Sequence, residues 1–288
     1  MFSVRKLGQT LGAEVTGLDL SKPLSDIDFE KIRNVFYDNS VIVIRGQKLT
    51  PEQHLAFSRR FGTLDVNVRK KFNKPGYDEI FVVSNVLVDG KPIGVQDAGR
   101  FWHTDLCYVT HPSSMSLLYA IEIPIQENGE AQGDTLFASV TAAYDALPND
   151  IKQKLDGKKA INSYNYTYES KVQKFNREPL TEEQKQKAPP DIAHPLIRTH
   201  PVTGKKCVFV NEGYSTQIVG MPETDGKTML SYLFDHVVKP EFLYRHRWQV
   251  GDLLMWDNCA VQHKAVFDYA LPLRRYMERT TITGTVPF

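Results

Sequence analysis

Cysteine is scarce in this 288-residue chain, which contains only Cys107, Cys207 and Cys259. They are widely spaced and form no C-x-x-C pair, so the sequence offers neither a disulfide framework nor a cysteine-based zinc motif. This pattern is typical of reduced thiols. We therefore expect a cytoplasmic protein.

Long hydrophobic runs and an excess of charge are also missing. No stretch approaches the ~18 apolar residues that a membrane span requires, and Met1 to Lys6 leads into polar sequence rather than the apolar core of a signal peptide. The 35 basic residues almost balance the 34 acidic ones, which gives no support for binding nucleic acid or an anionic membrane. A small molecule is the expected partner.

No Pro/Gly/Ser-rich linker and no internal repeat divides the chain, so we expect a single domain over residues 1–288. A hydrophobic content of 41% and a charged content of 24% are typical of a globular protein. Residues 157–193 are polar and rich in Lys, Gln and Tyr. We expect this stretch to be a surface insertion or a mobile lid rather than part of the core.

Helical periodicity is clearest over residues 26–40 and 224–238. Thr50, Pro51 and Gln53 predict the start of another helix, with a capping box. Strand-like runs cover residues 41–44, 80–86, 116–123, 133–137, 197–200, 206–210, 248–256 and 276–283. Many strands with helical insertions favour a mainly β fold, an antiparallel double-stranded β-helix (jelly roll, cupin-like) with flanking α-helices.

His103 and Asp105 are the first candidates for metal binding. On a strand, residues two apart share a face, so this imidazole and this carboxylate could reach one ion. Two histidines and one carboxylate leave open positions that suit non-haem Fe(II) oxygenases, although zinc is not excluded. Alone, the His-x-Asp pair is a weak signal, because a hydrogen-bonded surface histidine gives the same pattern.

Further motifs occur in order along the chain, and together they carry a family resemblance. They are Trp-His-Thr-Asp at 102–105, Gly-Asp-Thr at 133–135, Arg-Thr-His-Pro-Val-Thr-Gly at 198–204, Val-Asn-Glu-Gly at 210–213, Arg-His-Arg-Trp at 245–248, Trp-Asp-Asn at 256–258, and His263 followed by Arg-Arg-x-x-x-Arg. From Gly12 to Thr283 the chain resembles the taurine dioxygenase group of Fe(II)/2-oxoglutarate-dependent oxygenases, which also contains the phenoxyacetate dioxygenases.

The resemblance implies that His103, Asp105 and His263 bind Fe(II) and carry the catalysis, with 2-oxoglutarate and O2 as cosubstrates. The neighbouring Asp257 and Asn258 are predicted to orient His263. The implied reaction hydroxylates a C–H bond of a small anionic substrate and releases succinate and CO2. The implied fold is the same jelly roll.

An arginine is expected to hold the far carboxylate of 2-oxoglutarate, because its planar fork matches a carboxylate. The end of the family motif selects Arg275 for this role and Arg279 for the anionic group of the substrate. One extra residue before the arginines leaves Arg274 open as the alternative to Arg275. Thr135 matches the family threonine whose hydroxyl contacts the cosubstrate.

The substrate itself is less well indicated. The positions that contact substrate in sulfonate-cleaving relatives correspond to Asn67 and Lys70, and a family asparagine is replaced by Gly99. These departures argue against taurine and leave a sulfonate, a sulfate ester or a carboxylate. The other residues that match pocket-lining positions are Leu106, Tyr164 and Tyr214.

Three alternatives remain at this stage. Residues 80–103 also look like those of relatives that oxidise carboxylated amino-acid or natural-product precursors, including isonitrile-forming oxidases. A non-catalytic jelly-roll binding protein and a zinc hydrolase are the alternatives from other classes. Family members are commonly dimers or tetramers, so a homo-oligomer is expected by resemblance.

Overall fold

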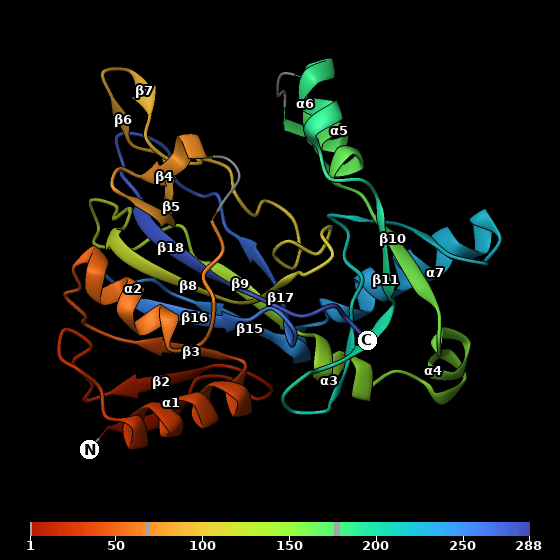
Figure 1. Cartoon of the computed structure of the whole chain (residues 1–288), viewed down its shortest axis with the longest axis horizontal. Coiled ribbons are helices and arrows are strands. Elements are labelled where there is room, and N and C mark those ends of the chain that lie inside the picture. Colours follow the sequence, from red (N-terminus) through yellow and green to blue (C-terminus); the bar gives the residue numbers. More distant parts are fainter. Residues whose placement is uncertain (1, 67–69, 176–178) are drawn as a thin grey trace.

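The largest element of the computed structural model, which describes residues 2–66, 70–175 and 179–288, is an eight-stranded sheet (Figure 1). All its strand pairs within the described residues are antiparallel except β2 with β3. The strands lie in the order β1 (Ser3–Lys6), β2 (Ala13–Thr16), β3 (Val41–Ile44), β16 (Leu253–Asp257), β8 (Ser113–Glu122), β18 (Tyr276–Thr283), β5 (Tyr77–Ser84) and β4 (Asn73–Lys74).

A smaller sheet packs against the large one. It contains β15 (Leu243–His246), β9 (Thr135–Ser139) and β17 (Val261–Ala265), with β9 in the centre. The two sheets share one core, which draws on alternate residues of the large sheet, as expected when one face is covered. Its members include Val41, Val43, Leu118, Leu254, Trp256, Met277, Phe137, Tyr244 and Val261. The chain is therefore mainly β, as predicted.

The opposite face of the large sheet is covered by two helices, α1 (Asp26–Asn39) and α2 (Pro51–Arg59). Ile42 and Ile44 of β3 pack there against the apolar side of α1. The predicted capping box at Thr50 is confirmed: its hydroxyl accepts from the Gln53 amide, and the Gln53 side chain accepts from the Thr50 amide.

The remaining elements form a second layer beside the small sheet, around its own apolar core (Figure 1). In this layer β10, β11 and β14 form one sheet and β12 and β13 another. The elements are α3 (Val140–Asp145), α4 (Asn149–Leu155), β10 (Lys159–Asn162), α5 (Tyr164–Phe175), α6 (Glu182–Lys187), β11 (Ile192–Pro195), β12 (Ile197–Thr199), β13 (Lys206–Val208), β14 (Ser215–Ile218) and α7 (Glu223–Val237).

Part of the stretch 157–193 does not fit the expected surface insertion. Ala160 and Asn162 of β10 are fully buried, because β10 pairs with a strand on each side. The polar composition of the stretch comes from α5 and α6, which project from one end of the molecule (Figure 1). The short elements are the hairpin β6 (Leu87–Val88) and β7 (Lys91–Pro92), η1 (Lys70–Phe72) and η2 (Pro240–Phe242).

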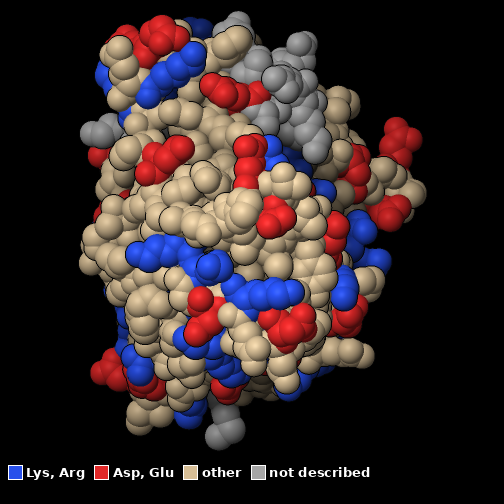
Figure 2. Space-filling model, turned by 90° about the vertical axis from the view of Figure 1, so that its right-hand side faces the viewer, with Lys and Arg blue, Asp and Glu red and all other residues tan. Residues whose placement is uncertain are grey.

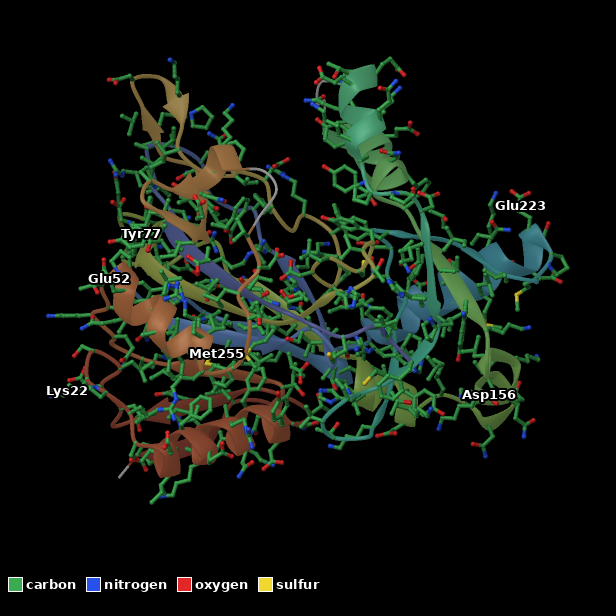
Figure 3. The ribbon with its side chains drawn as sticks, viewed as in Figure 1. Lys22, Glu52, Tyr77, Asp156, Glu223 and Met255 are labelled. Atoms are coloured by element: carbon green, nitrogen blue, oxygen red, sulfur yellow. The ribbon has the colours of Figure 1, made fainter. Side chains whose placement is uncertain are left out.

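Many charged side chains lie at the periphery of the molecule, although several, including Asp105 and Arg275, are buried. Figure 3 shows Lys22, Asp156 and Glu223 at the outside and Met255, which is fully buried, between the layers. On the face seen in Figure 2, basic and acidic residues are interspersed. No helix in the described part of the chain combines the length and the apolar character needed to cross a bilayer.

The contact between α1 and the large sheet should dominate the stability of the N-terminal part. We expect Ile32→Ala to lower the free energy of unfolding by about 2–4 kcal/mol, because Ile32 is fully buried and the change leaves a cavity. Ile27→Ala on the same helix is the matched control, with 71% of Ile27 exposed. Urea denaturation measures both; equal losses would contradict the packing.

Candidate metal and cosubstrate site

A short backbone pairing brings the first metal-ligand candidate to the small sheet. His103 and His263 form an isolated antiparallel bridge, in which the His103 amide donates to the His263 carbonyl (3.2 Å) and the His263 amide donates back (2.9 Å). The prediction that His103 and Asp105 share a strand face is wrong. The chain instead turns here, with Leu106 at a φ of 55°, and this turn sets the direction of the Asp105 side chain.

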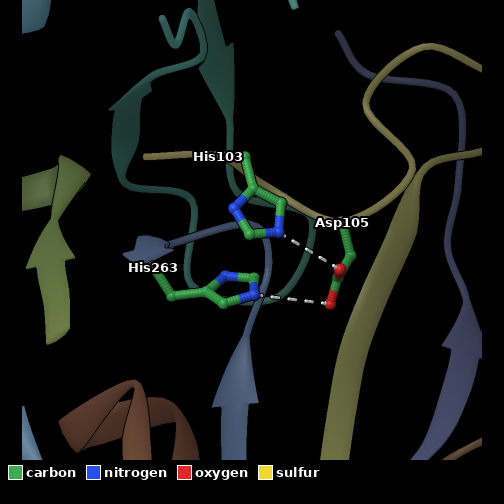
Figure 4. A group of neighbouring side chains, drawn as sticks. All are labelled: His103, Asp105 and His263. Atoms are coloured by element: carbon green, nitrogen blue, oxygen red, sulfur yellow. Dashed lines mark ion pairs between the residues drawn. The ribbon is translucent and has the colours of Figure 1, made fainter. Parts of the chain in front are cut away.

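The side chains of His103, Asp105 and His263 nevertheless converge (Figure 4). His103 Nε2 lies 3.8 Å from Asp105 Oδ1, and His263 Nε2 lies 3.9 Å from Asp105 Oδ2. The two imidazole rings are 4.2 Å apart between centroids. All three residues are buried, and one donor atom from each lies within 4.8 Å of the others. Two imidazoles and one carboxylate are the donor set that suits non-haem Fe(II).

The protonation of the histidines suits metal binding. The Phe101 carbonyl lies 2.9 Å from His103 Nδ1 and can only accept, so Nδ1 carries the hydrogen and Nε2 keeps its lone pair. Burial lowers the pKa of His263 to about 3, assisted by the neighbouring His103. The His263 ring is therefore neutral at neutral pH and can offer a nitrogen lone pair.

Asp105 is held as a carboxylate. Burial by itself would raise its pKa, but the Arg279 guanidinium, the two imidazoles and a hydrogen bond from Ser116 together lower the pKa well below its usual range. Arg279 Nη1 lies 3.1 Å from Oδ1, and Ser116 Oγ donates to Oδ2 at 2.8 Å. Each carboxylate oxygen thus has one fixed donor and faces one imidazole.

Asn258 fixes the carboxylate ligand rather than His263, so the predicted role of this residue is corrected. Its side-chain oxygen accepts from the Asp105 amide (3.3 Å), and its side-chain nitrogen donates to Ser116 Oγ (3.1 Å). His263 is placed instead by aromatic packing, with the ring of Trp256 4.9 Å and that of Phe137 6.0 Å from its own.

Asp257 belongs to a second buried cluster, with His200 and Cys259. His200 Nδ1 accepts hydrogen bonds from the amides of Val202 (3.1 Å) and Thr203 (3.0 Å). Its hydrogen must then lie on Nε2, which donates to Asp257 Oδ2 at 2.7 Å. No lone pair remains on Nε2, so we interpret this cluster as a hydrogen-bonded structural pair.

The candidates for the cosubstrate gather around Trp248. Its indole nitrogen donates to Thr135 Oγ1 at 3.1 Å, and the Arg275 guanidinium lies 5.8 Å from its ring centroid. Arg275 is only 5% exposed, its Nε has no hydrogen-bond partner, and no carboxylate among the described residues forms a salt bridge with it. A buried cation without an anion is expected to receive one from a ligand.

Arg274, the alternative, points elsewhere. Its Nε and Nη2 donate to both carboxylate oxygens of Glu122, at 2.8 and 3.1 Å, at the surface of the protein. A guanidinium that is already paired at the surface is poorly placed for 2-oxoglutarate, so the geometry favours Arg275.

The residues expected at the substrate divide into three groups. Leu106 and Arg279 line one small pocket together with Phe81, whose ring lies 5.2 Å from the Arg279 guanidinium. Asn67 lies outside the described residues, and Lys70 begins η1 with a side chain that is also outside them.

Tyr164 and Tyr214 belong to an aromatic cluster that reaches the metal-ligand candidates. Tyr108 lies between them, at 5.1 Å from Tyr164 and 4.8 Å from Tyr214, and Phe101 connects Tyr214 to the His103 ring.

Sequence reasoning gave no role in the site to Phe101, Tyr108, Ser116 or Trp248, although Trp248 belongs to the Arg-His-Arg-Trp motif. Ser116 carried a usable signal, because it is a polar residue at the start of the apolar run 117–121. The other three are aromatic residues whose sequence positions fit a core role equally well.

Comparison with known proteins decides the family. The model described as "Taurine catabolism dioxygenase TauD, TfdA family" matches residues 3–281. The chain belongs to this family. It is a 2-oxoglutarate-dependent dioxygenase that uses Fe(II) and O2.

Two curated relatives illustrate the range of the family. The chain is 35% identical over 280 residues to the alpha-ketoglutarate-dependent 2,4-dichlorophenoxyacetate dioxygenase of Cupriavidus pinatubonensis, covering 93% of each chain. It is 31% identical over 288 residues to an alkylsulfatase of Acinetobacter baylyi, covering 98% of this chain and 85% of the relative.

Solved structures agree over the whole chain. A taurine dioxygenase from Burkholderia xenovorans superposes with a TM-score of 0.81 at 29% identity, covering 99% of this chain and 90% of that one. AAD-2 in complex with Mn(II) and N-oxalylglycine also gives a TM-score of 0.81 at 29% identity, covering 100% and 99%.

The two buried clusters should differ in metal binding. We expect Co(II) to bind in one equivalent without the sulfur-to-metal charge-transfer absorption that a Cys259 ligand would produce, because His103 has a free Nε2 lone pair whereas both ring nitrogens of His200 are engaged in hydrogen bonds. Absorption titration measures this. His103→Ala should abolish tight binding, and Cys259→Ser should preserve it; a thiolate band that disappears in the serine variant would contradict the assignment.

Proposed function

We propose that His103, Asp105 and His263 hold the catalytic Fe(II), that Thr135 and Arg275 hold 2-oxoglutarate, and that the enzyme hydroxylates a C–H bond of a small organic anion. The observation that carries the proposal is that the three side chains converge in a buried site. Iron bound there would supply the activation of O2 while 2-oxoglutarate is oxidatively decarboxylated to succinate and CO2.

The chain's own residues prepare this chemistry. The Phe101 carbonyl keeps the His103 hydrogen on Nδ1, and Ser116 and Asn258 orient the Asp105 carboxylate. All three ligand candidates are at most 7% exposed, so bulk water has little access to their donor atoms. A fixed, dry donor set costs little reorganisation when the reaction begins.

Arg279 is the proposed partner of the substrate anion. It contacts Asp105 directly, so an anionic group bound by this guanidinium would lie beside the three ligands. Relatives named for a phenoxyacetate and for alkyl sulfates are consistent with a carboxylate, sulfate ester or sulfonate head group. Leu106 borders the same pocket and would contact the apolar part of the substrate.

The aromatic cluster supports a substrate with an extended apolar body. Tyr108, Tyr164 and Tyr214 offer flat apolar faces next to the His103 side of the site. Tyr164 is also the first residue of α5. We therefore propose that the projecting helices α5 and α6 act as the lid of the substrate pocket. By resemblance to sulfonate-cleaving relatives, we also propose Asn67 and Lys70 as substrate contacts.

The arrangement of the two sheets is consistent with a double-stranded β-helix in one catalytic domain over residues 1–288, which we propose as the fold. By resemblance we also propose a homo-oligomer, dimeric or tetrameric. A cytoplasmic location is consistent with the cysteines, since burial raises the pKa of Cys107 to about 12 and that of Cys207 to about 11 and makes these thiols unreactive.

The cosubstrate assignment predicts a contrast between adjacent arginines. Arg275→Gln should raise the KM for 2-oxoglutarate by about 100-fold or more, because it removes the buried partner of a carboxylate. Arg274→Gln should leave this KM nearly unchanged, since Arg274 is paired with Glu122 at the surface. Succinate release at varied 2-oxoglutarate measures both, and the reverse pattern would assign the role to Arg274.

The substrate assignment is tested by a screen and one substitution. Succinate release should rise with at least one compound among small sulfonates, sulfate esters, aryloxyacids and N-carboxymethyl amino acids. For the best compound, Arg279→Gln should lower kcat/KM by about 100-fold, the value of a charged hydrogen-bonded pair. A neutral ester or amide of the same compound serves as control; an equal loss for both forms would sink the role of Arg279.

A further inference from the structure

The segment between β17 and β18 is held by hydrogen bonds to Gly133 and Asp134, the two residues that precede β9. The Gly133 amide donates to the Asp268 carboxylate at 2.7 Å, and the Val266 amide donates to the Asp134 carbonyl at 2.9 Å. The Asp134 side chain is in turn bound by Arg245 Nε at 2.6 Å. These contacts fix the position of the residue that follows Asp268.

That residue is Tyr269, and its ring lies directly on Gly133. A Cβ atom on Gly133 would stand 2.8 Å from Tyr269 Cε1, 3.1 Å from Cδ1 and 3.4 Å from Arg275 Cδ. Gly133 also has a φ of +76°, which disfavours any other residue. The absence of a side chain at this position therefore lets Tyr269 and Arg275 approach each other beside Thr135.

The Tyr269 ring lies beside the Arg275 side chain, since both border the same point next to Gly133. Burial lowers the pKa of Arg275, and the nearby Tyr269 side chain opposes this decrease. A guanidinium can only donate, so the phenol oxygen could act toward Arg275 only as an acceptor. The phenol hydrogen then remains available for a second acceptor near Arg275.

We infer that Tyr269 is a positioning residue for 2-oxoglutarate, which donates its phenol hydrogen to the distal carboxylate that Arg275 binds. The inference rests on the proposed role of Arg275 and adds Tyr269 as a second hydrogen-bond donor to the same carboxylate. A carboxylate has about four lone-pair sites, of which a guanidinium fork fills two, so a further donor can be accommodated. The half-buried ring would also cover the carboxylate and strengthen its interaction with Arg275.

The test compares cosubstrates with and without the distal carboxylate on the Mn(II)-loaded protein. Tyr269→Phe should weaken the binding of 2-oxoglutarate and of N-oxalylglycine by about tenfold or more, the size expected for a hydrogen bond to a charged group. The same variant should bind 2-oxovalerate, which has the same chain length and no distal carboxylate, as the parent does. Calorimetry or competition titration measures the dissociation constants without turnover.

Tyr276→Phe is the matched control. Tyr276 follows Arg275 in the sequence, but its hydroxyl donates to Glu278 at 3.1 Å. Loss of this hydroxyl should therefore leave the affinities for 2-oxoglutarate, N-oxalylglycine and 2-oxovalerate unchanged. Unchanged binding of 2-oxoglutarate in Tyr269→Phe would overturn the inference, and so would an equal loss for 2-oxovalerate, which would indicate a general disturbance of the segment.

Arg275→Gln in the same titration separates the two proposals. If it weakens 2-oxoglutarate while Tyr269→Phe does not, the cosubstrate site stands and only the role of Tyr269 falls. If Arg275→Gln has no effect, both roles are wrong.

Discussion

The site depends on one buried carboxylate. Asp105 is only 6% exposed, and an isolated charge at that depth would be strongly unfavourable. Arg279 supplies the opposite charge and Ser116 supplies a hydrogen bond. The Nε2 atoms of His103 and His263 lie 3.8 and 3.9 Å from the two carboxylate oxygens. The bridge between the backbones of His103 and His263 holds these groups in place. Without that pairing, the His263 imidazole would not lie beside His103 and the Asp105 carboxylate.

The two arginines near the ends of the site have different electrostatic situations. They are four residues apart, or roughly 13 Å along an extended chain, and so point to the same side. Arg279 already has the Asp105 carboxylate, whereas Arg275 is desolvated and has no carboxylate among the described residues. A dianion such as 2-oxoglutarate, one end at the metal and the other at Arg275, would therefore neutralise the cation that the protein itself leaves uncompensated.

The sequence predicted the elements that local patterns determine: helix α1, the capping box at Thr50 and the strands β3 and β18. It also named the ligand candidates, because the ordered motifs carry them. It failed where tertiary contacts override local pattern. The turn after Asp105 needs Leu106 in a left-handed conformation, which nothing in that side chain favours. Strand β10 is buried by partners from distant segments, so its surroundings could not be read from the polar composition of residues 157–193.

Two adjacent polar residues at the end of β16, Asp257 and Asn258, belong to two different buried clusters. Asp257 is the last residue of β16 and Asn258 begins the turn that follows, and their side chains contact different partners. Asp257 faces His200, whose Nδ1 is saturated by two amides, and Asn258 faces Asp105 beside His103, whose Nδ1 meets a carbonyl. Both clusters contain histidine and aspartate, and their composition alone predicts the same chemistry. The hydrogen bond on the far nitrogen of each imidazole makes the difference: an amide there uses the lone pair and leaves the other nitrogen protonated, while a carbonyl frees the other nitrogen for a metal.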